Sequence, residues 1–270
     1  MTQIEPDWVS RVRKKVKHLR VAKEIFYYHE VNSTNVVAQK LVQQDTGNGT
    51  AIISSIQTAG RGRLGRNWES PSGGIWLSIV LYPPPQATNL SLITIVAAVA
   101  VARTVEKVLG IEAEIKWPND ILVGGMKVCG ILCELLSGPS GWAIIAGVGI
   151  NLNIDKEDLP ILETYPAGSL KMFARKEISE ERFMVHFFRN FNESYSNFLR
   201  GDQGRKRLLD RWRKHAEMLG KRIIIKLGDE LLEGIAKDVD NNGYLVFKAP
   251  NGEITHIMAG DITRIEPPKE

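Results

Sequence analysis

Residues 57–68, QTAGRGRLGRNW, place three arginines among three glycines and end on a tryptophan. Glycines let a backbone curl around a ligand with its N–H groups pointing inward. Arg61, Arg63 and Arg66 each carry a guanidinium that can bind phosphate or carboxylate oxygens through paired hydrogen bonds. Trp68 can offer a flat face to a nucleotide base. The segment suits a nucleotide, although a nucleic-acid contact or a mobile surface loop would have the same composition.

Two later segments carry polar groups of related chemistry. Residues 116–120, KWPND, follow a predicted strand, and their proline stiffens a turn that leaves Lys116 and Asp120 at a fixed edge. A lysine beside a carboxylate can serve phosphoryl or acyl transfer, but an ordinary charged turn would have the same sequence pattern. Residues 147–153, GVGINLN, combine glycines with Asn151, whose amide can donate and accept hydrogen bonds toward a base edge. A glycine-rich strand exit is the alternative interpretation.

Several other chemistries are excluded or disfavoured. The sequence has no G-x-x-x-x-G-K-[ST] P-loop, and no G-x-G-x-x-G segment opens a helix after a strand. Cys129 and Cys133 are the only cysteines, and they lie in an apolar run without a histidine at metal-ligand spacing. This favours reduced core thiols over a disulfide or a zinc site.

Length and charge indicate a globular protein. The 270 residues, 43% of them hydrophobic, are enough for one large domain and a second, small domain. The 35 basic and 31 acidic residues leave a net charge of +4, which is too slight to indicate a partner by itself. The first residues, MTQIEPDW, lack the features of a secretory signal, and the apolar run at 90–102 is shorter than the ~20 residues that span a bilayer. We expect a cytoplasmic protein with no membrane partner.

Hydrophobic periodicity predicts the elements that position these groups. Residues 8–24 have helical spacing and a basic opposite face, which either faces solvent or contacts nucleic acid. Further helices are predicted after a cap at 32–35, at 90–109 and at 179–217. Strands are predicted at 25–31, 50–57, 74–82, 113–117, 121–123, 127–136 and 142–146, and then at 221–227, 231–239, 244–249 and 253–258. Because few connections are long enough for parallel crossovers, the first part is predicted to be an α+β domain and the last part a small all-β barrel.

The order and spacing of four motifs resemble the biotin protein ligases. These motifs are NSTN from residue 32, QTAGRGRLGRNWESPSGGIWLSIVL from 57, KWPNDILVGGMKVCGILCEL from 116 and GVGINLN from 147. The resemblance covers roughly residues 25–270. It implies a biotin- and ATP-binding catalytic domain at 25–218 that is similar to class II aminoacyl-tRNA synthetases, with a mixed, largely antiparallel sheet and flanking helices. The basic helix then occupies 1–24 and the C-terminal barrel 219–270.

The resemblance also implies a two-step reaction. The carboxylate of biotin attacks the α-phosphate of ATP to give biotinyl-5′-AMP and pyrophosphate. A lysine of the biotin carboxyl carrier protein of acetyl-CoA carboxylase, or of a related carboxylase, then displaces AMP. Clustered cations would offset the repulsion between the two anions, and a glycine-hinged loop over the mixed anhydride would exclude water. ATP and biotin are then substrates, with Mg²⁺ as a cofactor.

Roles for individual residues follow from the same resemblance. It implies that biotin contacts Ser33, Thr34, Asn35, Gln57, Arg61, Gly62, Arg63, Lys127 and Gly130. It implies that ATP contacts Arg63, Arg66, Trp68 and Asn151, with Trp68 stacked on adenine. The expected catalytic residues are Arg63, Lys116, Asp120 and Lys127, and the expected Mg²⁺ ligand is Asp120. Arg264 lies one place off the family's usual arginine near the end of the barrel, which leaves its role open.

The chain departs from many bacterial members at its N-terminus. Those members carry a winged helix that represses biotin operons, and the residues before Ile25 are too few to form one. We therefore expect a ligase without repressor activity or specific DNA binding. A homodimer formed through sheet edges is a further expectation. The related lipoate ligases are the enzymatic alternative, and a basic nucleic-acid-binding module is the non-enzymatic one.

Overall fold

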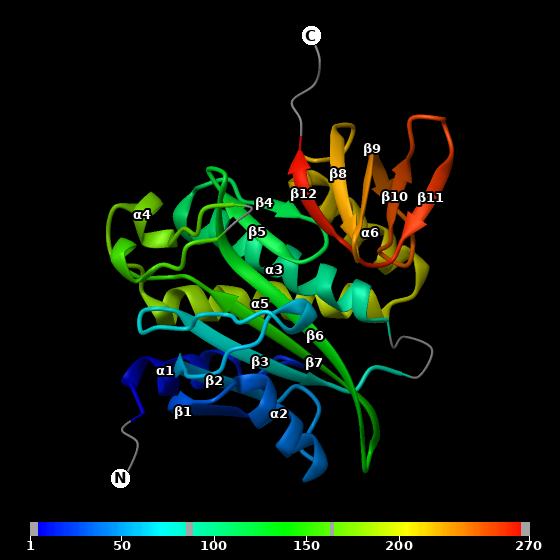
Figure 1. The fold of residues 1–270 in the computed structure, drawn as a ribbon. Helices are drawn as coiled ribbons and strands as arrows, with labels where there is room; N and C mark the ends of the chain where they lie inside the picture. Colours follow the sequence, from blue (N-terminus) through cyan, green and yellow to red (C-terminus); the bar gives the residue numbers. More distant parts are fainter. Residues whose placement is uncertain (1–4, 85–88, 163–164, 266–270) are drawn as a thin grey trace.

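A seven-stranded mixed sheet forms the larger part of the protein (Figure 1). The computed structural model describes residues 5–84, 89–162 and 165–265. The strand order is β1-β2-β3-β7-β6-β5-β4. The strands are β1 (Ile25–Val31), β2 (Ala51–Gln57), β3 (Ile75–Leu81), β4 (Glu114–Lys116), β5 (Asp120–Val123), β6 (Met126–Gly138) and β7 (Gly141–Ile150). The β1–β2 pair is parallel and the other neighbours are antiparallel, which confirms the predicted α+β class and largely antiparallel sheet.

Helices cover the two faces of this sheet differently (Figure 1). A layer of four helices packs on one face, and α2 (Thr34–Gln43) lies on the other. The layer contains α1 (Asp7–Val16), α3 (Leu90–Leu109), α5 (Glu180–Leu199) and α6 (Asp202–His215). Because successive side chains of a strand point to opposite faces, Cys129 and Ile131 of β6 join the helix-layer core while Gly130 and Leu132 face the side of α2. No helix within the described ranges is both long enough and apolar enough to cross a bilayer.

The structure corrects two helix predictions. The helix predicted at 8–24 ends at Val16, and the N–H of Ala22 then donates to the carbonyl of Gly49 as the chain turns into β1. The helix predicted at 179–217 is two helices, because Gly201 adopts a positive φ (70°), which favours glycine and is not helical, between α5 and α6. A short helix, α4 (Leu170–Ala174), also forms where periodicity predicted none.

The C-terminal part is a five-stranded antiparallel sheet of order β11-β10-β9-β8-β12. Its strands are β8 (Arg222–Leu227), β9 (Glu230–Val239), β10 (Leu245–Lys248), β11 (Ile254–Ile257) and β12 (Asp261–Ile265). The four predicted strands are present and β12 is an addition, while closure into a barrel stays a prediction. The apolar side chains of this sheet share a core with the helix layer, and the indole of Trp117 donates to the carbonyl of Gly243. The boundaries after residues 24 and 218 also stay predictions, and residues 1–4 and 266–270 lie outside the described part.

Candidate active site

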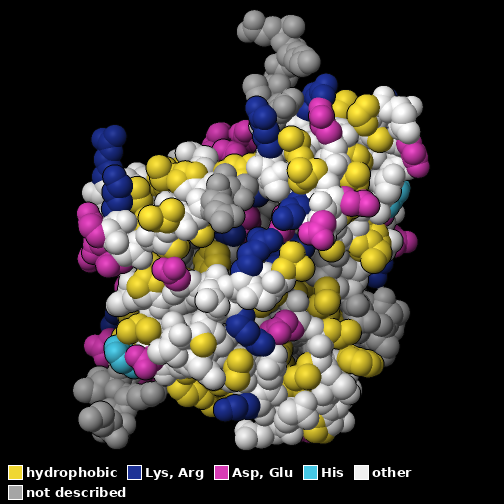
Figure 2. Space-filling view, viewed as in Figure 1, with side chains coloured by type: hydrophobic (Ala, Val, Ile, Leu, Met, Phe, Trp, Pro, Cys, Tyr) yellow, Lys and Arg dark blue, Asp and Glu magenta, His cyan; other side chains and the backbone are white. Residues whose placement is uncertain are grey.

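A cavity of about 680 Å³ opens between the α2 side of the large sheet, residues 57–68 and the start of β12. Figure 2 shows Lys and Arg side chains gathered near the centre of one face of the molecule, with Asp and Glu side chains beside them. Thirteen of the fourteen predicted site residues line the cavity: Ser33, Thr34, Asn35, Gln57, Arg61, Gly62, Arg63, Arg66, Trp68, Lys116, Asp120, Lys127 and Gly130. Asn151 is the exception.

Residues 57–68, the glycine-arginine loop, fold back on themselves beside the cavity. The N–H of Gly62 donates to the carbonyl of Arg66 (2.7 Å), and the N–H of Trp68 donates to the carbonyl of Gly60 (3.0 Å). A Cβ at Gly60 would lie 2.2 Å from the carbonyl oxygen of Trp68, so this turn needs a glycine there. The tip is a short 3-10 turn, and its Leu64 is exposed. The fold of the loop directs its arginines to the cavity.

Two arginines of the loop contact a carboxylate of the C-terminal sheet. Arg63 Nη1 lies 3.1 Å from Asp261 Oδ1 and donates to Asn119 Oδ1 at 3.1 Å. Arg66 forms an ion pair with the same Asp261. Burial lowers the pKa of Arg63, and the charge of Asp261 opposes that effect. The C-terminal sheet thus supplies the counter-charge for both arginines.

A second group of charges lies where β4 and β5 pair. Lys127 Nζ is 2.7 Å from Asp120 Oδ1, and Lys116 Nζ is 3.8 Å from Asp120 Oδ2. Lys116 and Asp120 are directly opposed in the β4–β5 register, which fixes their separation. Burial, which is the largest cause, together with the charge of Lys127 lowers the pKa of Lys116 to about 8 although Asp120 favours its charged form. Lys116 therefore changes charge near pH 8.

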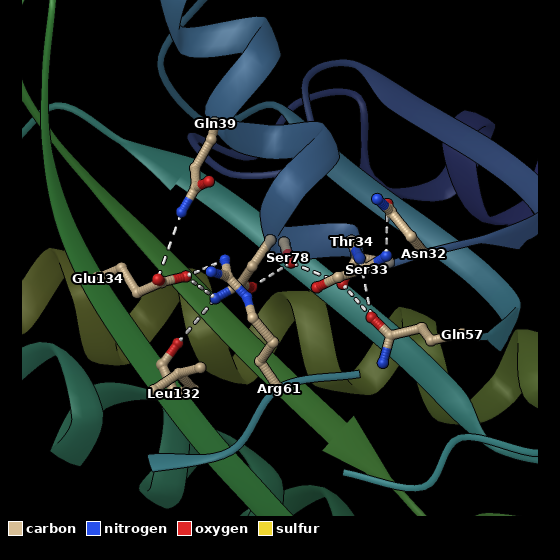
Figure 3. Close-up of polar contacts among 10 residues, drawn as sticks. Asn32, Ser33, Thr34, Gln39, Gln57, Arg61, Ser78, Leu132 and Glu134 are labelled. Atoms are coloured by element: carbon tan, nitrogen blue, oxygen red, sulfur yellow. Dashed lines mark hydrogen bonds and ion pairs between the residues drawn. The ribbon is translucent and has the colours of Figure 1, made fainter. Parts of the chain in front are cut away.

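The N-terminus of α2 forms the uncharged end of the cavity (Figure 3). Ser33, Thr34 and Asn35 are buried there, with 2%, 3% and 4% of their surfaces exposed. The expected cap at 32–35 needs correction, because the N-cap residue Ser33 makes no side-chain capping bond. Instead, the N–H of Thr34 donates to Oε1 of Gln57, which is the last residue of β2. A side chain from the sheet therefore anchors the helix terminus.

Two glycines make room for Trp68 on the sheet. Gly130 of β6 and Gly149 of β7 are directly paired, so a side chain at either position would point to the same side of the sheet. A Cβ would lie 2.7 Å from the indole ring at Gly130 and 2.4 Å from Trp68 Nε1 at Gly149. The ring centre lies 5.2 Å from Lys127 Nζ, and Trp68 Nε1 is buried without a hydrogen-bond partner among the described residues. Stacking of this indole on adenine stays a prediction.

The remaining predicted residues lie apart from the cavity wall. The amide of Asn151 donates to the carbonyl of Gly168 (2.9 Å), so its expected contact with adenine also stays a prediction. Of β12, residues 261–263 line the cavity and Arg264 does not. Within the described ranges, no group of three or more His, Cys, Asp or Glu side chains could hold a metal ion. Asp120 is thus a single carboxylate flanked by two lysines.

Among the residues at or behind the cavity wall that sequence analysis missed, three contact predicted cations. Asp261 pairs with the loop arginines, Tyr165 lies with its ring centre 4.2 Å from Lys116 Nζ, and Glu134 pairs with Arg61. Only Glu134 had a signal, since it belongs to the motif that starts at residue 116. Its alternation with Gly130 along β6 would have placed it on the cavity side of the sheet.

We predict that Gly149→Ala displaces the indole of Trp68 from the sheet, because the added methyl group would overlap Nε1. The tryptophan emission should shift to longer wavelength as the ring meets water. Subtracting the spectrum of Trp68→Phe, made alone and together with Gly149→Ala, isolates this residue. Gly47→Ala is the control, because a Cβ there would meet no atom within 4 Å. Identical emission from Trp68 in the Gly149→Ala variant and the wild type would refute the geometry.

Comparison with known proteins gives a consistent result. The model of the biotin/lipoate A/B protein ligase family matches residues 27–151, and that of the biotin protein ligase C terminal domain matches residues 218–264. The bifunctional ligase/repressor BirA of Bacillus subtilis is 31% identical over 255 residues, which are 94% of this chain and 78% of that protein. The biotin--(acetyl-CoA-carboxylase) ligase of Paracoccus denitrificans is 31% identical over 229 residues, which are 82% of this chain and 92% of that protein.

A solved structure extends the similarity to the fold. The biotin protein ligase from Aquifex aeolicus, in complex with biotin and ATP, superposes with a TM-score of 0.74 at 27% identity. The match covers 90% of this chain and 100% of that one. The fold, the cavity with its charged loop, the two matched family models and these relatives together establish that this chain is a ligase and belongs to the biotin protein ligase family.

Proposed function

We propose that this chain joins biotin to a lysine of a biotin carboxyl carrier protein through a biotinyl-5′-AMP intermediate. The carrying observation is that one cavity of about 680 Å³ contains both the uncharged pocket at the start of α2 and the cations of the glycine-arginine loop. An acid with a polar, uncharged head and ATP would need these two environments side by side. The names of the Paracoccus relative and of the Aquifex complex support biotin, ATP and acetyl-CoA carboxylase as the substrates.

The cations suit the first step of this reaction. The biotin carboxylate attacks the α-phosphorus of ATP, a P–O bond to the carboxylate forms, and the bond to the leaving pyrophosphate breaks. Both reactants are anions, and negative charge accumulates on the phosphoryl oxygens. Arg63, Lys116 and Lys127 line the space in which they would meet, and preorganised cations there lower the barrier. Their existing carboxylate partners keep them in place before ATP binds.

The second step needs protection from water rather than more charge. The carrier lysine, as the neutral amine, attacks the carbonyl carbon of biotinyl-5′-AMP, an amide bond forms, and AMP leaves. Water would attack the same carbon. The glycine-arginine loop lies beside the cavity and its tip reaches the C-terminal sheet through Asp261, so it is placed to cover the mixed anhydride.

Magnesium fits this site as an ion that arrives with ATP. Mg²⁺ keeps several waters and is usually held by one or two carboxylates together with substrate phosphates. Asp120 is the residue that would hold it, and its two lysine neighbours would then be free to contact phosphate. When bound, the ion would offset part of the phosphate charge.

Biotin is favoured over lipoate by the C-terminal match. The family that matches residues 27–151 includes both biotin and lipoate ligases, whereas the domain that matches residues 218–264 is described for biotin protein ligases. The homodimer and the cytoplasmic location expected from the sequence stay predictions. Sedimentation of the purified protein tests the first, and cell fractionation tests the second.

We expect the purified protein to catalyse ATP–pyrophosphate exchange when biotin is added and not when lipoate is added. Arg63→Ala and Lys127→Ala should each slow this exchange by about a hundredfold or more, because each removes a cation from the phosphate site. Arg103→Ala is the matched control, since Arg103 pairs with Glu193 on the helix layer. Circular dichroism checks that each variant folds. Lipoate-dependent exchange, or wild-type rates in either folded variant, would contradict the assignment.

The lowered pKa of Lys116 gives the exchange reaction a specific pH profile. This amine is protonated below its pKa of about 8 and neutral above it, so phosphate stabilisation is present at lower pH and is lost as pH rises through about 8. We predict that kcat/KM for ATP falls over that range. Lys116→Arg should be slower but should lack this fall, because arginine stays charged. A fall that persists in Lys116→Arg would assign it to another group.

We also propose that this chain does not recognise operator DNA. The apolar residues of α1, Val9, Val12 and Val16, are fully buried, and Arg11 and Lys15 both pair with Glu181 of α5. The basic helix is thus part of the helix layer, and these two basic side chains already have a carboxylate partner. A mobility shift near physiological salt, with biotin and ATP present, should show equal weak binding to a biotin operator and to a scrambled duplex. A clear preference for the operator would refute this proposal.

A further inference from the structure

Lys226 of β8 is a further cation of the cavity wall, and it belongs to the C-terminal sheet rather than to the large sheet or the glycine-arginine loop. The three arginines of the loop, Lys116 and Lys127 each pair with a carboxylate. Lys226 is exposed and makes no ion pair within residues 5–84, 89–162 and 165–265. Its charge is therefore available to an anion that enters the cavity.

The pairing of β8 with β12 directs Lys226 toward the glycine-arginine loop. Lys226 lies directly opposite Asp261 in this antiparallel pair, so the two side chains are on the same face of the C-terminal sheet. Asp261 uses Oδ1 for Arg63 and Oδ2 for Arg66. One carboxylate thus stands among three cations, and its two oxygens serve the two arginines. This end of the cavity keeps an excess of positive charge.

Arg63 connects this end with the charges of the large sheet. Its Nη1 donates to Asn119 Oδ1 at 3.1 Å and lies 3.1 Å from Asp261 Oδ1. The uncharged pocket of the same cavity is at the start of α2, and Figure 1 shows α2 and the C-terminal sheet at opposite ends of the molecule. The cavity therefore extends from an uncharged end at α2 to a cationic end at the C-terminal sheet.

The chemistry of phosphoryl transfer gives this direction a meaning. The attacking and the leaving oxygens lie roughly in line on opposite sides of the phosphorus. In the proposed function the attacking carboxylate belongs to biotin, whose uncharged head suits the pocket at α2. The leaving pyrophosphate then points away from α2 and toward the C-terminal sheet. The excess cation lies where the most highly charged part of ATP would arrive.

We propose that Lys226 binds the β- and γ-phosphates of ATP and the pyrophosphate formed from them. This inference rests on the proposed function. When the bond to the α-phosphorus breaks, its electron pair stays on the oxygen that becomes part of pyrophosphate, and an ammonium group beside that anion stabilises it. AMP and biotinyl-5′-AMP lack both phosphates. Lys226 consequently serves the first step of the reaction and not the second.

The first test compares the two steps in the full chain. Lys226→Ala should lower kcat/KM for ATP in biotin-dependent ATP–pyrophosphate exchange about tenfold and leave KM for biotin within about twofold. Transfer of biotin from purified biotinyl-5′-AMP to a biotin carboxyl carrier protein should stay within about twofold of the wild-type rate. Lys226→Arg should retain most of the exchange activity, because it keeps the positive charge.

The matched control is Lys248→Ala. Lys248 of β10 is likewise an exposed lysine of the C-terminal sheet that makes no ion pair among the described residues, but it does not line the cavity. Both steps should be unchanged in this variant. Circular dichroism checks that each variant folds.

Three outcomes would overturn the inference. Wild-type kcat/KM for ATP in folded Lys226→Ala would show that this charge contacts no phosphate. Slower transfer with normal exchange would assign Lys226 to the carrier protein instead. Equal losses in both steps would make Lys226 a support for Asp261 and the glycine-arginine loop rather than a phosphate ligand.

A binding measurement separates this inference from the proposed function. Titration calorimetry with inorganic pyrophosphate should give a Kd about tenfold higher for Lys226→Ala than for the wild type, whereas the Kd for AMP should be the same within about twofold. Lys248→Ala should match the wild type for both ligands. Equal affinities of Lys226→Ala and the wild type for pyrophosphate would overturn the inference. The expected loss of pyrophosphate affinity, in a wild-type protein that shows no biotin-dependent exchange, would support the phosphate site and overturn the proposed function.

Discussion

Charge balance is the constraint on which the cavity depends. Six cationic side chains of the described residues line it, and without counter-charges they would repel one another in a partly buried space. Three carboxylates supply the balance for five of them: Glu134 for Arg61, Asp261 for Arg63 and Arg66, and Asp120 for Lys116 and Lys127. Each carboxylate is on a strand, so regular structure holds the charges that keep the glycine-arginine loop folded. An anionic substrate can take over as the counter-charge where it enters.

Side chains along β6 and β7 alternate between the core side of the sheet and the cavity side. One face of β6 and β7 contributes apolar residues to the core beneath the helix layer, and the opposite face contributes glycines to the cavity. Gly130 and Gly149 leave space for the indole of Trp68, and Gly147 leaves space for the amide of Asn35. The glycines of these strands thus serve close approach of side chains rather than backbone flexibility. The side chains on the core-facing side of β6 and β7 are packed beneath the helix layer, and this packing holds the cavity-facing side of the strands in place.

Local patterns in the sequence predicted most of the elements, and together with the resemblance to the family they predicted thirteen of the residues that line the cavity. The bounds of the helix at 90–109 agree with α3, and the strands that flank the glycine-arginine loop form as expected, because their signals lie within each segment. Gly201 was not recognised as a break, since the helical pattern continues on both sides of it. Polar partners that are distant in sequence were the main omission. Asp261 lies 198 residues from Arg63, and Glu134 lies 99 residues from Asn35, so only the folded sheets bring them together.

Detection of the acyl adenylate on the protein tests most directly whether these balanced cations serve to form and shield a mixed anhydride. Native mass spectrometry of the protein incubated with biotin, ATP and Mg²⁺, without any carrier protein, gives the mass of whatever the cavity retains. We predict a complex whose added mass is that of biotinyl-5′-AMP, together with release of pyrophosphate. Retention of biotin and ATP as separate, unreacted molecules, or of no ligand, would contradict that role for the cavity.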